Sequence, residues 1–501
     1  MSAWRNLPVL AVVLAMLAAL AAAPLAAQPA RPEQLTYPPL DFEPPRAEPL
    51  RHVLPGGVVV YVVPDHALPL VNVVMNLRTG AFLEPAAKPG LAGMTAALLR
   101  VGGAGERTPE QFDERADFLA AQLGASAGDT SSRVSLNVLS SALEPGLDLL
   151  FDMLRRPRFD EARLAVEKGK ALEAMKQRND DADDILSREW SWLMSGREHF
   201  SSRRATAAQL ASITREDLAD FHRRTWGSEG MVIAVSGDVE PARILDALGK
   251  RLAGFRAAER AAWPPKGPEF TPKPGLYRVE KDIPQGKVRI GHRSLQVTDW
   301  SSPDLYALEM LNDVLGGSGF TSRLMKRVRS DEGLAYGAGS NIGFGVWWPA
   351  NFTAGFASKN PTVAYALRIV LDEIERIRRE PVSDDELRVA KSAAVQTFPR
   401  GFESAAQIAG TFAQDELIGR SHAYWYDYRE RIDAVTPAEL LRVAQRYLHP
   451  DQLVMLVVGK WAEIAPGDPQ GRATMAAFGG GRTELLPLRD PLTLEALPPA
   501  P

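Results

Sequence analysis

The side chains that most often bind metals or act as nucleophiles are scarce and scattered in this sequence. The chain contains no cysteine, so thiolate ligands, thiolate nucleophiles and disulfide bonds are excluded. No two of its seven histidines are three or four residues apart, so no helix can present a histidine pair to a metal ion. Histidines at the surface or in ordinary hydrogen bonds are the simpler interpretation. They are His52, His66, His199, His222, His292, His422 and His449.

One pair of residues in the second half of the chain could support acyl-transfer chemistry. Arg329 and Tyr336 lie between Ser322-Arg323-Leu324 and the end of Gly333-Leu334-Ala335-Tyr336. A guanidinium and a phenol can both donate hydrogen bonds to a developing oxyanion, usually the largest single contribution to such catalysis. The alternative is structural, with Arg329 as an ion-pair partner and Tyr336 as a core residue.

A glycine-rich segment, Gly316-Gly317-Ser318-Gly319, precedes that pair. It lacks the Lys-Ser/Thr ending of a phosphate-binding loop and follows a predicted helix rather than a strand, so phosphate binding is disfavoured. Glycines let a backbone approach a peptide closely. We therefore interpret the segment as a flexible loop.

An internal duplication supplies the elements that would position these residues. Thr214 begins a helix that is followed by a buried-type strand at 231–238, and Thr436 with the strand at 453–460 repeats this pattern 222 positions later. A second pair of segments, 159–164 and 382–387, agrees with that offset within one residue. Two matches at nearly the same offset predict two homologous halves.

Each half mixes strands and helices in the same order. In the first half, strands at 58–63 and 71–77 precede helices near 90–100 and 109–123, and a strand at 132–138 precedes a long helix at 161–177. This order predicts an α+β fold of two homologous α/β-sandwich halves. Each half would be a mostly antiparallel sheet with helices packed on one face.

Composition, charge and the N-terminal residues indicate which partners and which cellular location the chain could have. The chain has 501 residues and a net charge of -4, so nothing in its electrostatics favours nucleic acid as a partner. Arg5 followed by the apolar run 7–20 and small residues up to Ala27 is typical of a secretory signal. An uncleaved anchor is the alternative, but the run is shorter than the roughly 20 residues of a membrane span. The signal predicts export to the periplasm of a bacterial envelope.

Pro-rich stretches and the repeat suggest boundaries along the chain. We predict a signal peptide at 1–27, a Pro-rich lead-in at 28–50, an N-terminal domain at 51–254, a Pro-rich linker at 255–275, a C-terminal domain at 276–465 and a surface tail at 466–501.

Four stretches together resemble the pitrilysin/insulinase family of zinc peptidases, over about residues 45–465. The last of them departs from the family signature at Ser330, where a glutamate is expected. The four are Gly90-Leu91-Ala92, Glu167 on the helix after Phe159-Asp160-Glu161, Gly316-Gly317-Ser318-Gly319, and Ser322-Arg323-Leu324 through Tyr336.

The resemblance implies a metal site whose ligands this chain lacks. The inverted zinc motif of the family, His-x-x-Glu-His, falls on Gly93, Ala96 and Ala97, and the distant glutamate ligand falls on Ala174. Active members bind zinc through two histidines and that glutamate, and the motif glutamate activates the water. We expect that this chain binds no metal and is inactive as a peptidase alone.

The resemblance also implies a role and a partner. In split members that form a clamshell, one chain keeps the zinc motif and the other keeps the Arg–Tyr pair and the glycine loop. This sequence has the second pattern, so we expect a non-catalytic, substrate-binding subunit of a heterodimeric zinc metallopeptidase that acts on peptides. It would supply Arg329, Tyr336 and the loop 316–319 to a homologous, zinc-bearing partner. The alternative is a catalytically inert structural or peptide-binding subunit of an envelope complex.

Overall fold

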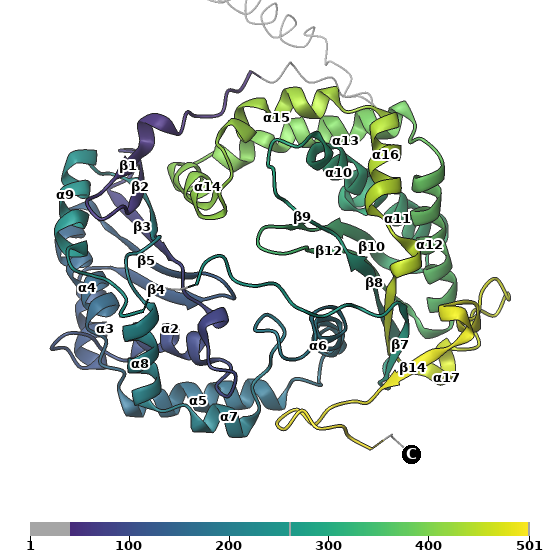
Figure 1. Cartoon of the computed structure of the whole chain (residues 1–501), viewed down its shortest axis with the longest axis horizontal. Helices are drawn as coiled ribbons and strands as arrows, with labels where there is room; N and C mark the ends of the chain where they lie inside the picture. Colours follow the sequence, from purple (N-terminus) through teal and green to yellow (C-terminus); the bar gives the residue numbers. More distant parts are fainter. Residues whose placement is uncertain (1–40, 260–261, 499–501) are drawn as a thin grey trace, which may run out of the picture. The chain divides into compact units, whose positions relative to one another are not determined.

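The computed structural model describes residues 41–259 and 262–498. The elements below lie within residues 44–501, which form one compact unit (Figure 1). The signal peptide predicted at 1–27 lies outside the described residues, as does the lead-in up to residue 40. In the part of the chain that the structure describes, no helix is both long and apolar enough to cross a membrane.

The first sheet has six strands and is built from the first half of the chain. Its only parallel pair is β2 with β6, and the other neighbours are antiparallel. In spatial order the strands are β1 (Arg51–Val53), β2 (Val59–Pro64), β6 (Val232–Gly237), β3 (Leu70–Leu77), β5 (Ser132–Leu139) and β4 (Gln122–Ala127).

The second sheet repeats this arrangement with strands from the second half. Its order is β10 (Ala335–Ile342), β12 (Asn351–Lys359), β8 (Gln285–Arg293), β13 (Val454–Gly459), β7 (Gly275–Glu280) and β14 (Thr483–Leu486). Strands β13 and β7 are parallel, as are β7 and β14, and the other pairs are antiparallel. Read from β7 to β10, the order and directions match those from β2 to β4, which confirms the predicted α+β class and the duplication.

The helices follow the same duplication. Those of the first half are α2 (Leu91–Val101), α3 (Pro109–Phe118), α4 (Leu143–Arg155), α5 (Glu161–Lys176), α6 (Ala182–Ser195), α7 (Ala207–Ser212), α8 (Arg215–Thr225) and α9 (Pro241–Leu252). Those of the second half are α10 (Pro303–Asn312), α11 (Arg323–Met325), α12 (Val363–Arg379), α13 (Asp384–Thr397), α14 (Ala405–Ile418), α15 (Ala423–Ala434), α16 (Pro437–Tyr447) and α17 (Trp461–Ile464).

Local sequence explains where the paired helices α8 and α16 begin. Thr214 and Thr436 each accept a hydrogen bond from the backbone amide three residues on, and the acidic side chain there accepts from the threonine amide. This reciprocal pair satisfies two amides that a helix leaves without partners in its first turn. Proline at the first position of α16 adds a φ angle already suited to a helix.

Removing one of these caps should have a measurable, modest effect. We expect Thr436→Ala to lower the free energy of unfolding by about 1 kcal/mol, because the Glu439 amide loses its acceptor. Denaturant unfolding followed by circular dichroism measures the change. Thr436→Ser keeps the hydroxyl and should match the parent chain, and an unchanged Thr436→Ala variant would contradict the assigned cap.

The two halves exchange one helix each. Helix α14, from the second half, packs on β2 and β6 of the first sheet, and α6, from the first half, packs on β8 and β13 of the second (Figure 1). Neighbouring side chains on a strand point to opposite faces. Val60 and Val62 enter the core of the first half, whereas Tyr61 donates a hydrogen bond to Glu416 of α14 at 2.9 Å. Each sheet therefore carries helices of its own half on one face and a helix of the other half on the second.

The contact between α14 and the first sheet combines apolar and charged groups. The rings of Tyr61 and Phe412 lie 5.9 Å apart, and Phe412 is completely buried. Arg51 on β1 donates through Nε and Nη2 to the two carboxylate oxygens of Glu416, at 2.9 Å each. A fork of this kind fixes direction as well as distance, so it sets how α14 lies on the sheet.

The segment after residue 465, expected as a surface tail, contributes more than a covering. Residues 483–486 form β14, which extends the second sheet beside β7. Further on, the chain returns to the first half, where the Asn179 side chain donates to the Arg489 carbonyl at 2.6 Å and the Ala207 amide to the Leu492 carbonyl at 2.8 Å. The sequence of this segment is rich in Gly and Pro, and its pairing could not be read from periodicity.

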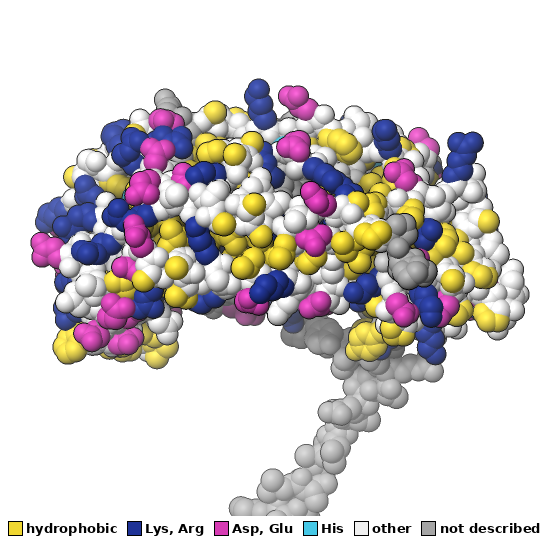
Figure 2. Space-filling view, turned by 90° about the horizontal axis from the view of Figure 1, so that it is seen from below, with side chains coloured by type: hydrophobic (Ala, Val, Ile, Leu, Met, Phe, Trp, Pro, Cys, Tyr) yellow, Lys and Arg dark blue, Asp and Glu magenta, His cyan; other side chains and the backbone are white. Residues whose placement is uncertain are grey.

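The surface carries charges of both signs. Figure 2 shows one face of the molecule, where Lys and Arg side chains are interspersed with Asp and Glu and apolar side chains lie between them. This mixture agrees with the small net charge of -4.

Candidate functional site

The helix that resembles a zinc motif is well formed but has no ligand atoms at the relevant positions. The Glu84 carboxylate accepts hydrogen bonds from the backbone amides of Gly90 at 3.0 Å and Ala92 at 2.7 Å, and so caps the start of α2. Gly93 faces solvent with open space around it, Ala97 is half-buried, and Ala96 is buried in the core. The folded helix is kept by its buried apolar face, which does not depend on the missing side chains.

The position of the distant ligand is equally unsuited to zinc. Helix α5 packs against α2, which places Ala174 on the helix expected to supply the third ligand, where it is exposed. Zinc in proteins is held by Cys, His, Asp or Glu, and Gly93, Ala97 and Ala174 offer none of these. Within residues 41–259 and 262–498, no group of three or more such side chains is placed to hold a metal ion. The residues at this site do not fit the zinc of the family.

The structure brings Arg329 and Tyr336 together and adds a third residue. The Arg329 guanidinium lies over the Tyr336 ring at 4.6 Å and over the Phe320 ring at 4.7 Å. Tyr336 is 86% exposed and Phe320 is 69% exposed. Stacking on ring faces holds the plane of a guanidinium while leaving the N–H groups at its edge available. We call Phe320, Arg329 and Tyr336 the Arg–aromatic stack.

The structural alternative for this pair does not fit the geometry. Tyr336 is among the most exposed large side chains of the described chain and is not a core residue. No carboxylate in the described ranges lies within ion-pair distance of Arg329. Its contacts are with the two rings. Sequence reasoning missed Phe320, which lies within the glycine-rich region and carries no spacing signal of its own.

Two π-helical turns position the stack. One covers Asp313–Gly317 and the other covers Lys326–Asp331, which contains Arg329. Both turns pack on β10, the edge strand that begins next to Tyr336. The amide of Gly333, at a φ of +63°, closes the second turn on the Arg329 carbonyl at 3.0 Å. Turns of this type widen the helix by one residue and are frequent at functional sites.

The glycines of the predicted loop have packing roles. A methyl group at Gly316 would lie 2.4 Å from the Ser340 amide nitrogen of β10, and one at Gly317 would lie 2.4 Å from Asn312 Nδ2. Gly319 differs, because it has a φ of +62° and open space around it. The Ser318 hydroxyl donates to the Asp313 carbonyl at 2.7 Å, so the start of the loop is anchored. Close approach to a peptide, as expected from the sequence, is available at Gly319.

Two carboxyl groups beneath this region were missed by sequence reasoning. Burial raises the pKa of Glu309 to about 7 and the pKa of Asp313 to about 6. The hydroxyl of Tyr428 donates to Glu309. The available signal was a pair of acidic residues four apart on the otherwise apolar helix α10 and the turn that follows it, since such residues are seldom buried without a reason.

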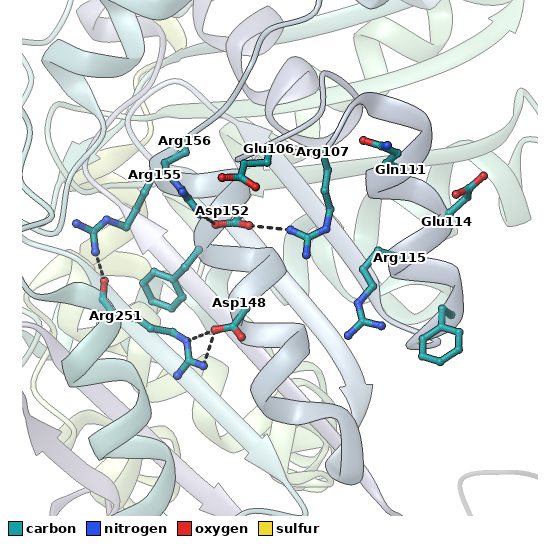
Figure 3. Close-up of a pocket in the computed structure, with 12 residues that line it drawn as sticks. Glu106, Arg107, Gln111, Glu114, Arg115, Asp148, Asp152, Arg155, Arg156 and Arg251 are labelled. Carbon is teal, nitrogen blue, oxygen red and sulfur yellow. Dashed lines mark hydrogen bonds and ion pairs between the residues drawn. The ribbon is translucent and has the colours of Figure 1, made fainter.

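A large surface hollow lies elsewhere and has mostly paired charges (Figure 3). It is lined by α3, α4 and α9, where Asp152 pairs with Arg107 at 3.1 Å and Arg251 donates to Asp148 at 2.7 Å. Arg115 lies over the exposed Phe118 ring at 5.2 Å. Because exposed ion pairs of this kind are screened by solvent, we assign no chemistry to this hollow.

Comparisons with known proteins show which peptidases this chain is related to. The family model described as "Peptidase M16 inactive domain" matches residues 212–394. An uncharacterized zinc protease of Mycobacterium tuberculosis is 27% identical over 407 residues, covering 80% of this chain and 91% of that protein. The chain is a homologue of the M16 peptidases, the pitrilysin family.

Two further comparisons agree with the M16 relationship. The probable mitochondrial-processing peptidase subunit beta of Arabidopsis thaliana is 21% identical over 379 residues, covering 71% of this chain and 68% of that protein. The crystal structure of a peptidase M16 inactive domain from Pseudomonas fluorescens has a TM-score of 0.74 at 22% identity, covering 82% of this chain and 97% of that one. At this identity the structural likeness establishes the fold, and the sequence relatives establish homology to zinc proteases.

Proposed function

We propose that this M16 homologue is the non-catalytic, substrate-binding subunit of a heterodimeric zinc metallopeptidase that hydrolyses peptides in the periplasm. The observation that carries the proposal is the Arg–aromatic stack, which holds a half-buried guanidinium over two exposed rings, with no carboxylate of the described residues paired with it. The metal-site positions of the same chain, Gly93, Ala97 and Ala174, have no ligand atoms. A homologous partner would hold the zinc and the activated water.

In this proposal, the partner supplies the zinc and this chain supplies hydrogen-bond donors to the substrate. A peptide carbonyl becomes an oxyanion during hydrolysis, and positioned hydrogen-bond donors stabilise that charge. Arg329 would donate from its N–H groups and Tyr336 from its hydroxyl, while Gly319 would allow the peptide backbone to approach. The location in the periplasm rests on the signal predicted at 1–27.

The direct test is purification of the tagged chain from its native cell envelope, followed by an assay of the eluate with an unfolded peptide. We expect a stoichiometric partner that contains His-x-x-Glu-His, and hydrolysis that a zinc chelator abolishes. The isolated chain should be inactive. An inactive complex would instead support the structural or peptide-binding subunit, and hydrolysis by the isolated chain would overturn both assignments.

A second prediction concerns Phe320. If its ring face holds Arg329, then Phe320→Leu should lower turnover by the complex about twofold to fivefold, because an exposed stack of this kind contributes about 0.5–1 kcal/mol. Phe320→Tyr keeps the ring face and should restore turnover. Steady-state kinetics of both variants separate stacking from apolar bulk, since a role in bulk alone would be met equally by leucine.

A further inference from the structure

A second cavity, of about 890 Å³, joins three segments that are far apart in the sequence. They are residues 82–83 after β3, residues 195–200 with Arg203 after α6, and residues 262–267 with 269–270 in the stretch before β7. The volume lies within the 300–1,000 Å³ or so of small-ligand pockets, which suits one or two residues of a peptide and not a folded chain. We call it the aromatic pocket.

Several aromatic rings line its walls. Phe82 lies 6.2 Å from Phe200 and 6.0 Å from Trp263, with ring planes steeply inclined in both pairs. Trp348 supports the pocket from behind, at 5.7 Å from the Phe200 ring. Phe270 also lines the cavity and is 39% exposed. Edge-to-face packing of this kind fixes rings in place, so the walls form a preshaped apolar site.

His199 belongs to the wall and not to the chemistry of the pocket. One ring nitrogen is within hydrogen-bond distance of the Ser201 hydroxyl at 2.8 Å, and the other of the Lys266 carbonyl at 3.1 Å. Burial lowers the pKa of this histidine, which favours the neutral ring. With both nitrogens occupied, it offers a ligand only the face and edge of its ring.

Arg203 supplies the polar group of the pocket. Its Nη2 donates to the Glu198 carbonyl at 2.7 Å, but its Nε and Nη1 are buried and lack acceptors among the described residues. The nearby carboxylate of Glu84 is already engaged by the amides of Gly90 and Ala92 at the start of α2. A buried donor without a partner costs about 1–3 kcal/mol, so this guanidinium has hydrogen bonds to give to an incoming acceptor.

The charged side chains that line the pocket, Arg203 included, sum to one net positive charge. Arg197 and Lys266 line it together with Arg203, against Glu198 and Glu269. An occupant that suits these walls combines one large apolar side chain with an anionic group. In a peptide, those two features occur together on one residue at the free C-terminus.

We propose that the aromatic pocket binds the C-terminal residue of a peptide, with its aromatic or large aliphatic side chain between the rings and its carboxylate on Arg203. This inference rests on the proposed function, since it names the class of peptide that the subunit would select. A carboxylate accepts a strong, charge-assisted hydrogen bond from a guanidinium, and either Nε or Nη1 of Arg203, which have no acceptor among the described residues, would donate it. Peptides with a free apolar C-terminus are the products of an earlier endopeptidase cut.

The test uses the isolated full chain and a fluorescein-labelled hexapeptide that ends in phenylalanine. Fluorescence anisotropy should show that the free acid binds at least about tenfold more tightly than the same peptide with a C-terminal amide. It should also bind about tenfold more tightly than a peptide that ends in alanine. Equal affinities for acid and amide would overturn the proposal.

Two variants assign the two preferences to their residues. Arg203→Gln should abolish the preference for the acid over the amide, and Phe270→Ala should abolish the preference for phenylalanine over alanine. Phe118→Ala, which removes an exposed ring from the hollow lined by α3, α4 and α9, should change neither. Retention of both preferences in both variants would overturn the assignment. If Arg203→Gln does not fold, two measurements still test the proposal. They are the comparison of acid and amide peptides on the parent chain and the peptide preference of Phe270→Ala.

Failure here is distinguishable from failure of the proposed function. Binding is measured without the zinc-bearing partner, so an inactive or absent complex would not affect it. Conversely, a complex that hydrolyses peptides while the isolated chain ignores their C-termini would leave the subunit assignment standing and reject the pocket.

Discussion

Replacing Arg329 by alanine is expected to lower peptide turnover by the complex about 100-fold to 1,000-fold, the usual cost of removing one donor to a developing oxyanion. The guanidinium lies over the rings of Phe320 and Tyr336, and neither contact is a hydrogen bond to an acceptor. Because no ion pair of the described chain depends on Arg329, the variant should fold normally and still bind its partner. Steady-state hydrolysis and gel filtration of the complex measure the two properties.

Further variants separate charge from shape at this site. Arg329→Lys keeps the charge but loses the planar fork of donors, so it should recover only part of the activity. Arg388→Ala removes an exposed arginine whose one ion pair within residues 41–259 and 262–498 is with Asp385 in the same helix turn, and should leave turnover unchanged. Full activity of Arg329→Ala would show that the Arg–aromatic stack has no role in hydrolysis.

The stability of the chain should fall as the pH rises from about 5 to 8, in part because of Glu309. Burial raises the pKa of this carboxyl to about 7, from 4.5, so the folded state keeps a proton that the unfolded state has already lost. The stabilisation is complete below pH 4.5 or so and is lost as the pH passes through the folded pKa near 7. Over this range the loss amounts to about 2–3 kcal/mol.

A neutral residue at position 309 isolates this contribution. Glu309→Gln still offers Tyr428 an acceptor but cannot ionise, so its free energy of unfolding should exceed that of the parent by about 2–3 kcal/mol at pH 8 and by much less at pH 5. Asp313, whose pKa is raised to about 6, adds a smaller term of the same sign. Urea unfolding at both pH values measures the difference. Glu403→Gln, at an exposed position, should show parallel profiles, and parallel profiles for Glu309→Gln would contradict the account.

Local patterns were enough to predict much of the fold. The strands predicted at 231–238 and 453–460 form β6 (Val232–Gly237) and β13 (Val454–Gly459), within one residue of each predicted end, because a buried strand needs little beyond its own side chains. Thr214 and Thr436 cap their helices because the whole capping motif lies within four residues. The predicted helix at 109–123 is shorter, since α3 ends at Phe118 and Gln122 already belongs to β4.

The candidate site was only partly visible in the sequence. Arg329 and Tyr336 could be matched by their spacing, but Phe320 reaches Arg329 only through the two π-helical turns, which no helical periodicity describes. The aromatic pocket combines three distant segments, so Trp263 and Phe82 have no common pattern. The sequence of α14 also does not indicate which of the two sheets this helix covers, because its apolar side chains could pack on either sheet.

The exchange of α6 and α14 between the halves has a consequence for how the chain reaches its folded state. The strands of the first sheet are complete once Gly237 has been synthesised, but their second face stays uncovered until residues 405–418 exist. Until then, the ring of Tyr61 and the apolar side chains beside it have no native cover, and exposed surface of this kind promotes aggregation. When only the N-terminal half has been synthesised, its sheet lacks the helix that covers its second face. The two halves must therefore complete their folding together. A duplicated ancestor whose copies swapped a helix could no longer be divided at the linker into two self-sufficient proteins.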